Sequence, residues 1–132
     1  MQRIRQEIRA PDAEVRNAAT IGDRQLLDLV AAHHHGMECL RIGDNLTVTP
    51  AAMLSAAQSL PRLRTLCLRG TRCATDEVVR AFVSHCPELQ RLDLSDCAAL
   101  TDLGRIGNCR ELLELRLARC SAAVTPELVC SL

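Results

Sequence analysis

Three consecutive histidines and a nearby cysteine are the residues best suited to bind a metal. His33, His34 and His35 are closely followed by Cys39, and imidazole and thiolate are ligands that zinc prefers. Structural zinc sites usually pair their ligands through short repeated spacings such as Cys-x-x-Cys, and the sequence contains no such pair. The spacing therefore predicts no specific metal site, and we expect no cofactor.

Eight cysteines are the other candidates for chemistry, because a thiolate beside a general base can act as a nucleophile. Most of them recur at positions typical of core or turn packing, where a thiol stays neutral and inert. Cys39 and Cys67 are predicted to point outward, either as oxidation-sensitive contacts or as small exposed side chains. The sequence has no phosphate-cradling glycine loop and no His-Asp-Ser constellation. We therefore expect a protein that is not an enzyme.

The elements that position these residues repeat along the chain. In each copy, apolar residues occupy the first, fourth and sixth places, and the first places (Met37, Leu63, Leu89 and Leu112) are 26, 26 and 23 residues apart. The alternation around each sixth place predicts a short strand whose apolar side chains point inward. The ninth places are expected in the following turn: Asn45, Thr71, Cys97 and Cys120.

A helix start is predicted after each strand. The cap and first-turn pairs are Thr49-Pro50, Thr75-Asp76, Thr101-Asp102 and Thr125-Pro126. The helices should turn two sets of side chains inward: Met53, Ala56 and Leu60, then Val79, Phe82 and Cys86. The third copy is shorter and contains Gly104 and Gly107, so it predicts a single turn or an irregular segment.

Residues 1–36 are predicted to form an N-terminal helical cap. Asp23 is expected to cap a helix that ends near Gly36. The three-and-four spacing gives its buried face as Leu26, Leu29, Val30 and His33. Aligning this segment with the helices of the later copies gives a different buried face: Leu27, Val30 and His34. The arginine-rich opening segment is either a surface helix or frayed terminus, or a mitochondrial presequence.

The stretch from about Asp23 to Leu132 resembles the cysteine-containing class of leucine-rich repeats, found in the substrate-recognition parts of F-box proteins. Two copies carry the resemblance: Cys86-Pro87-x-Leu89-x-x-Leu92-x-Leu94-x-x-Cys97 and Cys109-x-x-Leu112-x-x-Leu115-x-Leu117-x-x-Cys120. The copies that begin at Met37 and Leu63 are looser matches. No separate F-box is found, because the N-terminal part is assigned to the cap.

The resemblance implies an α/β fold, a right-handed solenoid with a short parallel β-sheet on the concave face and helices on the convex face. Its repeats would span residues 37–62, 63–88, 89–111 and 112–132, the last one incomplete. It also implies a non-catalytic protein–protein interaction module that holds a protein partner on the concave face. Nothing in the pattern supplies a catalytic residue.

The outward positions of the predicted strands form columns if the strands stack in register. The columns are Cys39, Thr65, Arg91 and Glu114; Arg41, Cys67, Asp93 and Arg116; and Gly43, Arg69, Ser95 and Ala118. Neighbouring strands lie about 4.8 Å apart, so Arg91 could pair with Glu114, or Asp93 with Arg116. We expect the partner to contact Arg41, Cys67, Arg69, Arg91, Asp93, Ser95, Glu114 and Arg116. The alternatives are an ordinary solvated sheet or binding through the convex helices.

Composition narrows the partners. The formal net charge is zero and Phe82 is the only aromatic residue, so nucleic acid is an unfavoured partner. All basic residues apart from histidine are arginines, which can bind carboxylates with two parallel hydrogen bonds. No apolar run is long enough to span a membrane. Free thiols and no visible secretory signal predict an intracellular reducing compartment: cytoplasm, nucleus or mitochondrial matrix.

The sequence stops at Val129-Cys130-Ser131-Leu132 without a polar cap over the last repeat. Three interpretations stay open: a fragment of a longer repeat protein, a subunit whose partner covers this edge, or self-association through it. The alternative function is therefore that of a structural subunit in a larger assembly.

Overall fold

Helices and strands alternate in the computed structural model, which describes residues 21–33, 36–103 and 106–120. The elements are α3 (Asp23–His33), β1 (Cys39–Arg41), α4 (Pro50–Ser59), β2 (Thr65–Cys67), α5 (Asp76–His85), β3 (Arg91–Asp93), the 3₁₀ turn η1 (Ile106–Asn108) and β4 (Glu114–Arg116). The strands form one parallel sheet in the order β1-β2-β3-β4. The expected α/β fold with a parallel sheet is confirmed.

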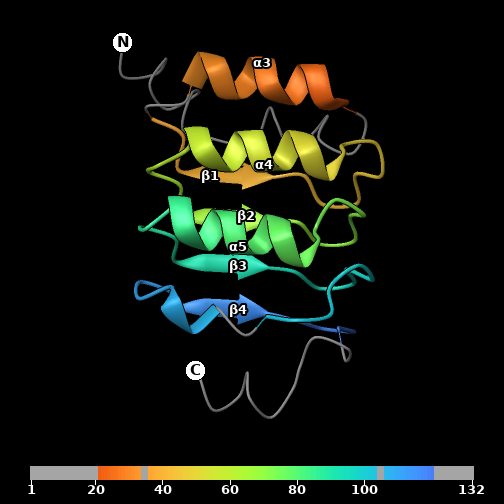
Figure 1. Cartoon of the computed structure of the whole chain (residues 1–132), viewed down its shortest axis with the longest axis vertical. Helices are drawn as coiled ribbons and strands as arrows, with labels where there is room; N and C mark the ends of the chain where they lie inside the picture. The colour runs from red at the N-terminus through yellow and green to blue at the C-terminus, as the bar shows by residue number, and fades with distance from the viewer. Residues whose placement is uncertain (1–20, 34–35, 104–105, 121–132) are drawn as a thin grey trace.

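The molecule has two layers (Figure 1). Helices α3, α4 and α5 lie side by side over one face of the sheet, each in contact with the next, and η1 contacts α5. All four strands run in the same direction, as parallel strands joined by crossover helices must. The other face of the sheet, here called the open face, carries no helix of the described residues (Figure 1).

The core lies between the two layers. Leu40 and Leu66 are fully buried and Leu92 is 2% exposed, whereas the residues on either side of them in the strands are partly or fully exposed. Met53 of α4 and Phe82 of α5 are fully buried and belong to the same hydrophobic cluster as these leucines. Fully burying a side chain of this size stabilises a fold by roughly 1.5–3 kcal/mol. Because the leucines alternate with polar residues along each strand, only one face of the sheet gains this stabilisation, and the helices cover that face.

Helices α4 and α5 begin where the sequence predicts. The Thr49 hydroxyl accepts a hydrogen bond from Ala52 N at 3.3 Å, and the Thr75 hydroxyl accepts one from Val78 N at 3.2 Å. Both predicted inward sets are buried: Met53, Ala56 and Leu60, and Val79, Phe82 and Cys86. No α-helix begins at Thr101 in the described residues, and the expected single turn is present as η1. Thr125-Pro126 lies outside the described residues.

Helix α3 differs from its prediction in two ways. Leu26 N donates to Gly22 O at 3.0 Å, so Gly22 holds the cap position and Asp23 is the first helical residue. The alignment that turned Leu27 inward is wrong, because Leu27 is 37% exposed while Leu26 is fully buried. The three-and-four spacing gave the correct face, and His34 lies outside the described residues.

The turns after the strands are equivalent to one another. Asp44, Gly70, Asp96 and Arg119 all adopt a positive φ, between 59° and 70°, at intervals of 26, 26 and 23 residues. Backbone hydrogen bonds continue past the strands at this level, from Asp44 N to Arg69 O, Gly70 N to Ser95 O and Asp96 N to Ala118 O, at 2.7–2.9 Å. The turn residues of positive φ therefore recur at the same intervals as the copies in the sequence.

Candidate functional site

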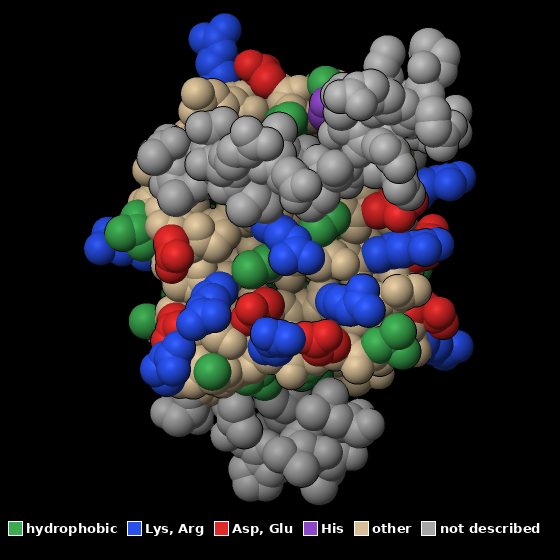
Figure 2. Space-filling model, turned by 180° about the vertical axis from the view of Figure 1, so that it is seen from behind, with side chains coloured by type: hydrophobic (Ala, Val, Ile, Leu, Met, Phe, Trp, Pro, Cys, Tyr) green, Lys and Arg blue, Asp and Glu red, His purple; other side chains and the backbone are tan. Residues whose placement is uncertain are grey.

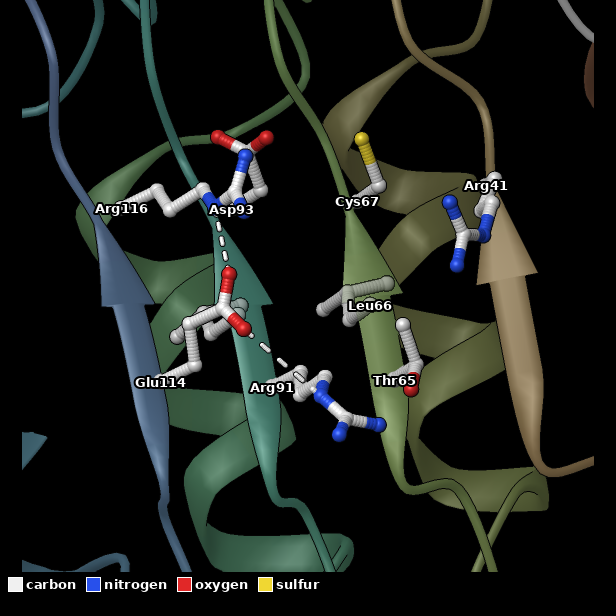
Figure 3. A pocket seen from close by; sticks show the side chains of 9 residues that line it. Arg41, Thr65, Leu66, Cys67, Arg91, Asp93, Glu114 and Arg116 are labelled. Atoms are coloured by element: carbon white, nitrogen blue, oxygen red, sulfur yellow. Dashed lines mark hydrogen bonds and ion pairs between the residues drawn. The ribbon is translucent and has the colours of Figure 1, made fainter.

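A pocket of about 210 Å³ lies on the open face of the sheet (Figure 3). All four strands contribute to its walls. The residues that line it are Arg41, Thr65, Leu66, Cys67, Arg91, Leu92, Asp93, Glu114 and Arg116. Six of the eight residues expected to contact a partner are among them; the remaining two, Arg69 and Ser95, are not. Thr65, which the sequence placed in an outward column without a binding role, also lines the pocket.

The strand register brings the predicted columns together. Thr65 pairs with Cys39 on one side and with Arg91 on the other, and Arg91 pairs with Glu114. Cys67 pairs with Arg41 and with Asp93, and Asp93 pairs with Arg116. The first two columns are therefore confirmed. Figure 2 shows basic and acidic side chains intermingled over this face.

Glu114 is the centre of the charged contacts in the pocket. Arg91 Nε lies 3.6 Å from its carboxylate, as the columns predict, and Arg116 Nε also binds it. The alternative pairing of Arg116 with Asp93 is not found; Asp93 Oδ1 accepts a hydrogen bond from Ser95 N at 3.0 Å instead. The arginine side chains are 58% and 64% exposed, so these ion pairs contribute at most about 1 kcal/mol each to folding.

A second charged group lies beyond the pocket, at the turns. Asp96 binds Arg69 Nε at 3.5 Å and Arg119 Nη2 at 2.7 Å. The hydrogen bond from Arg119 is the main cause that holds the pKa of Asp96 below its usual value; desolvation opposes it, and the charges of Arg119 and Arg69 lower the pKa further. Arg69 was among the residues predicted to contact a partner, whereas Asp96 and Arg119 were not. The sequence pattern that could have identified them is their position, because Asp96 and Arg119 each follow the last residue of a strand by three places.

Ser95 is buried, so its predicted outward position in the third column is wrong. It is 4% exposed, and its hydroxyl accepts a hydrogen bond from Ala118 N at 3.1 Å. Ser95 lies past the end of β3 at Asp93 and directly before the turn residue Asp96, whose φ is 60°, so it belongs to the turn and not to the strand. Strict alternation of side chains ends there.

Cys39 and Cys67 are both partly exposed, as predicted. Arg41 Nε donates to Cys39 Sγ at 3.3 Å. Burial raises the pKa of the Cys67 thiol. A backbone hydrogen bond with Arg69 is the next largest effect and lowers the pKa, the charge of Asp93 raises it, and the charges of Arg41 and Arg69 lower it, with a net rise. A neutral thiol is a poor nucleophile, so Cys67 offers the pocket a small uncharged surface.

The other described cysteines are buried thiols. Burial raises the pKa of Cys86 to about 12 and that of Cys97 to about 11. Both donate to backbone carbonyls of the preceding unit: Cys86 Sγ to Leu60 O at 3.2 Å and Cys97 Sγ to Leu68 O at 2.9 Å. Within residues 21–33, 36–103 and 106–120, no group of three or more histidine, cysteine or acidic side chains could hold a metal ion.

Comparisons with protein-family models and with curated proteins find no match to this chain. Within the described part of the chain, no helix is long and apolar enough to cross a bilayer.

Proposed function

We propose that the chain is a leucine-rich-repeat solenoid of the cysteine-containing class. Three observations support this assignment: the strand-to-strand register, the recurrence of a left-handed turn residue at the repeat spacing, and the thiols that bind carbonyls of the preceding unit. The assignment makes the open face the concave face of the solenoid and the helices its convex face.

We propose further that the protein is a non-catalytic interaction module that binds a protein partner through the open face. The observation that carries this proposal is the pocket, because three strands place an exposed arginine there: Arg41, Arg91 and Arg116. Arginine forks bind carboxylates and backbone carbonyls directionally, and arginine is enriched in protein interfaces. The neutral thiol of Cys67 gives no support to covalent chemistry at this face. Free thiols throughout the described cysteines favour a reducing compartment as its location.

The test is capture of partners from source lysate by the protein and by two variants of equal charge. The first variant carries glutamine at four arginines of the open face: Arg41, Arg69, Arg91 and Arg116. The second carries glutamine at four exposed arginines that do not line the pocket: Arg24, Arg62, Arg72 and Arg80. We expect the first variant to lose the captured proteins and the second to keep them. Capture that survives the first variant contradicts binding through the open face. If the first variant is still captured as part of an assembly of fixed stoichiometry, the alternative function of a structural subunit is supported.

A further inference from the structure

The arginines of the open face and of the turns beside it differ in how closely they hold a carboxylate. Arg116 donates a hydrogen bond to Glu114, and Arg119 binds Asp96 through Nε and, at 2.7 Å, through Nη2. Each of these two carboxylates therefore has one arginine close enough to neutralise its charge.

Arg91 and Arg69 approach the same carboxylates less closely. Arg91 Nε lies 3.6 Å from the Glu114 carboxylate, and Arg69 Nε lies 3.5 Å from that of Asp96. The upper limit for an N–H···O hydrogen bond is about 3.2 Å, so neither guanidinium group forms one through this contact. The two arginine side chains are 58% and 52% exposed. Because both carboxylates are already neutralised, Arg91 and Arg69 keep a positive charge and guanidinium donors for a ligand.

Arg91 and Arg69 are separated by four residues along the sheet. Arg91 on β3 pairs with Thr65 of β2 and turns its guanidinium toward β2 (Figure 3), and Arg69 follows Thr65 by four residues. Backbone hydrogen bonds from Leu68 and Gly70 continue the ladder past the end of β2, so the spacing of a strand holds up to Arg69. Four residues of a parallel strand span about 13 Å. A peptide in extended conformation places its residues i and i+4 on one face at nearly the same distance.

Asp93 lies midway between the two arginine positions. It pairs with Cys67, which is two residues before Arg69 in the chain. Its carboxylate accepts a hydrogen bond from a neutral donor, the Ser95 amide, at 3.0 Å. The face therefore presents an arginine at each end of this stretch and a carboxylate at its centre.

Resting on the proposed function, we propose that the open face binds an extended segment of the partner with two acidic residues four positions apart, whose carboxylates contact Arg91 and Arg69 while a residue that is not acidic faces Asp93. Charge complementarity selects this occupant. The pattern does not require Arg41, which donates to Cys39 Sγ. A nucleic acid fits less well, because it carries a phosphate on every nucleotide and would place negative charge against Asp93. The face also offers no aromatic platform for bases, since the only aromatic side chain of the sequence is fully buried.

The probes are fluorescently labelled, C-terminally amidated peptides of serine and glutamate. The test peptide carries two glutamates four positions apart, and its isomer carries them side by side. A third peptide adds a glutamate midway between the spaced pair, and a labelled oligothymidine represents a polyanion. Binding is measured by fluorescence anisotropy at low ionic strength for the parent protein, Arg69→Gln, Arg91→Gln and Asp93→Asn. The control is Arg80→Gln, at an exposed position of α5, and circular dichroism verifies that each variant is folded.

We expect the test peptide to bind the parent about fivefold more tightly than its isomer, because only the spaced carboxylates reach both arginines. Arg69→Gln and Arg91→Gln should each abolish this preference, and Arg80→Gln should leave it unchanged. The midway glutamate should weaken binding to the parent but not to Asp93→Asn, which lacks the opposing carboxylate.

Equal binding of the test peptide and its isomer, no binding of either, or a preference that survives both arginine variants overturns the proposal. Tighter binding of the peptide with three glutamates, or of the oligothymidine, overturns it as well. If partner capture is nevertheless lost with the variant that carries glutamine at four arginines of the open face, this face remains the binding surface and only the acidic pattern assigned to the partner is wrong.

Discussion

One turn position recurs in successive units and is occupied by Asn45, Thr71, Cys97 and Cys120. Their amide, hydroxyl and thiol side chains all form hydrogen bonds to backbone groups. Asn45, Cys97 and Cys120 reach back to a carbonyl of the preceding unit, at 3.0, 2.9 and 2.8 Å. Thr71 bonds within its own unit, to Leu68 O at 2.7 Å. The position selects for a small buried hydrogen-bond donor, which explains why such different residue types share it.

Asn45→Ala should destabilise the fold by about 2–4 kcal/mol. The fully buried amide accepts from Thr47 N and Val48 N, both at 2.8 Å, and donates to Ile21 O, so alanine leaves three backbone groups without this partner. Urea unfolding followed by circular dichroism measures the loss. The control is Thr47→Ala at the exposed neighbouring position, and an equal effect of both substitutions contradicts the prediction.

Stability should fall as the pH rises above 9, because the sequence lacks both lysine and tyrosine and thiols are the only side chains that titrate there. In the folded protein, burial raises the pKa of Cys86 from 9.0 to about 12 and that of Cys97 to about 11. The unfolded chain therefore loses thiol protons first between pH 9 and 11, and the free energy of unfolding decreases, by about 1–3 kcal/mol in total.

Urea unfolding under reductant at pH 8 and pH 11 measures this decrease. The variants Cys86→Ala and Cys97→Ala are expected to be less stable than the parent at pH 8 but to lose less stability between the two pH values. A parent protein whose free energy of unfolding is the same at both pH values would show that these thiols do not control alkaline stability.

At the scale of the element, the sequence predicted those helix starts that depend on contacts between residues close together in the chain. Thr49 and Thr75 accept bonds from amides three residues on, so the starts of α4 and α5 could be read directly. Asp23 has a local cap signal but binds Thr49 from a different unit, at 2.8 and 2.7 Å. Leu27 was misplaced because alignment by period assumes that α3 keeps the phase of the later helices. Contacts between units leave no pattern in neighbouring residues of the sequence. This explains why the cap role of Asp23 and the inward position of Leu27 were both predicted wrongly.

Asp76→Ala should loosen the third unit. Partial burial alone would raise the pKa of the Asp76 carboxyl, but hydrogen bonds from Thr101 and Asp102 hold it below 3.8. The carboxylate therefore stabilises the fold above this pH, and its contribution is lost as the pH falls through the lowered pKa. At pH 7 we expect a loss of about 1–2 kcal/mol and faster hydrogen exchange at the Thr101 and Asp102 amides.

The matched control for this substitution is Glu77→Ala, an exposed acidic residue in the same first turn of α5. It removes the same charge near the same helix end without touching Thr101. Equal acceleration of exchange in both variants would assign the effect to the helix dipole and not to the contact between units.

At the scale of the whole molecule, the proposed repeat architecture predicts that a unit can be added. Duplicating residues 63–88 in tandem should insert one strand and one helix, because the unit makes its register contacts only with its neighbours. We expect stronger helical circular dichroism and a higher urea midpoint in a cooperative transition. A duplicated chain that aggregates, or that unfolds at a lower midpoint, contradicts the repeat assignment.

At the scale of the whole molecule, the part of the candidate site that depends on how the strands align with one another could be predicted. Alternation and period sufficed to bring Arg41, Cys67, Arg91 and Glu114 onto one face. They could not show that Arg116 selects Glu114 over Asp93, because both carboxylates are within reach of a flexible side chain. Side-chain choice among equivalent partners depends on three-dimensional geometry that the spacing does not encode.

The segment from Leu89 to the next copy at Leu112 is three residues shorter than the two segments before it, and η1 is the only helical segment among its described residues. Arg91 nevertheless pairs with Glu114, and Asp93 with Arg116, in the same register as in the longer units. Insertions and deletions are thus absorbed in the helical layer without moving the strands. The length of the segment between β3 and β4 is thus not what holds the side chains of the open face in line; the strand register does that.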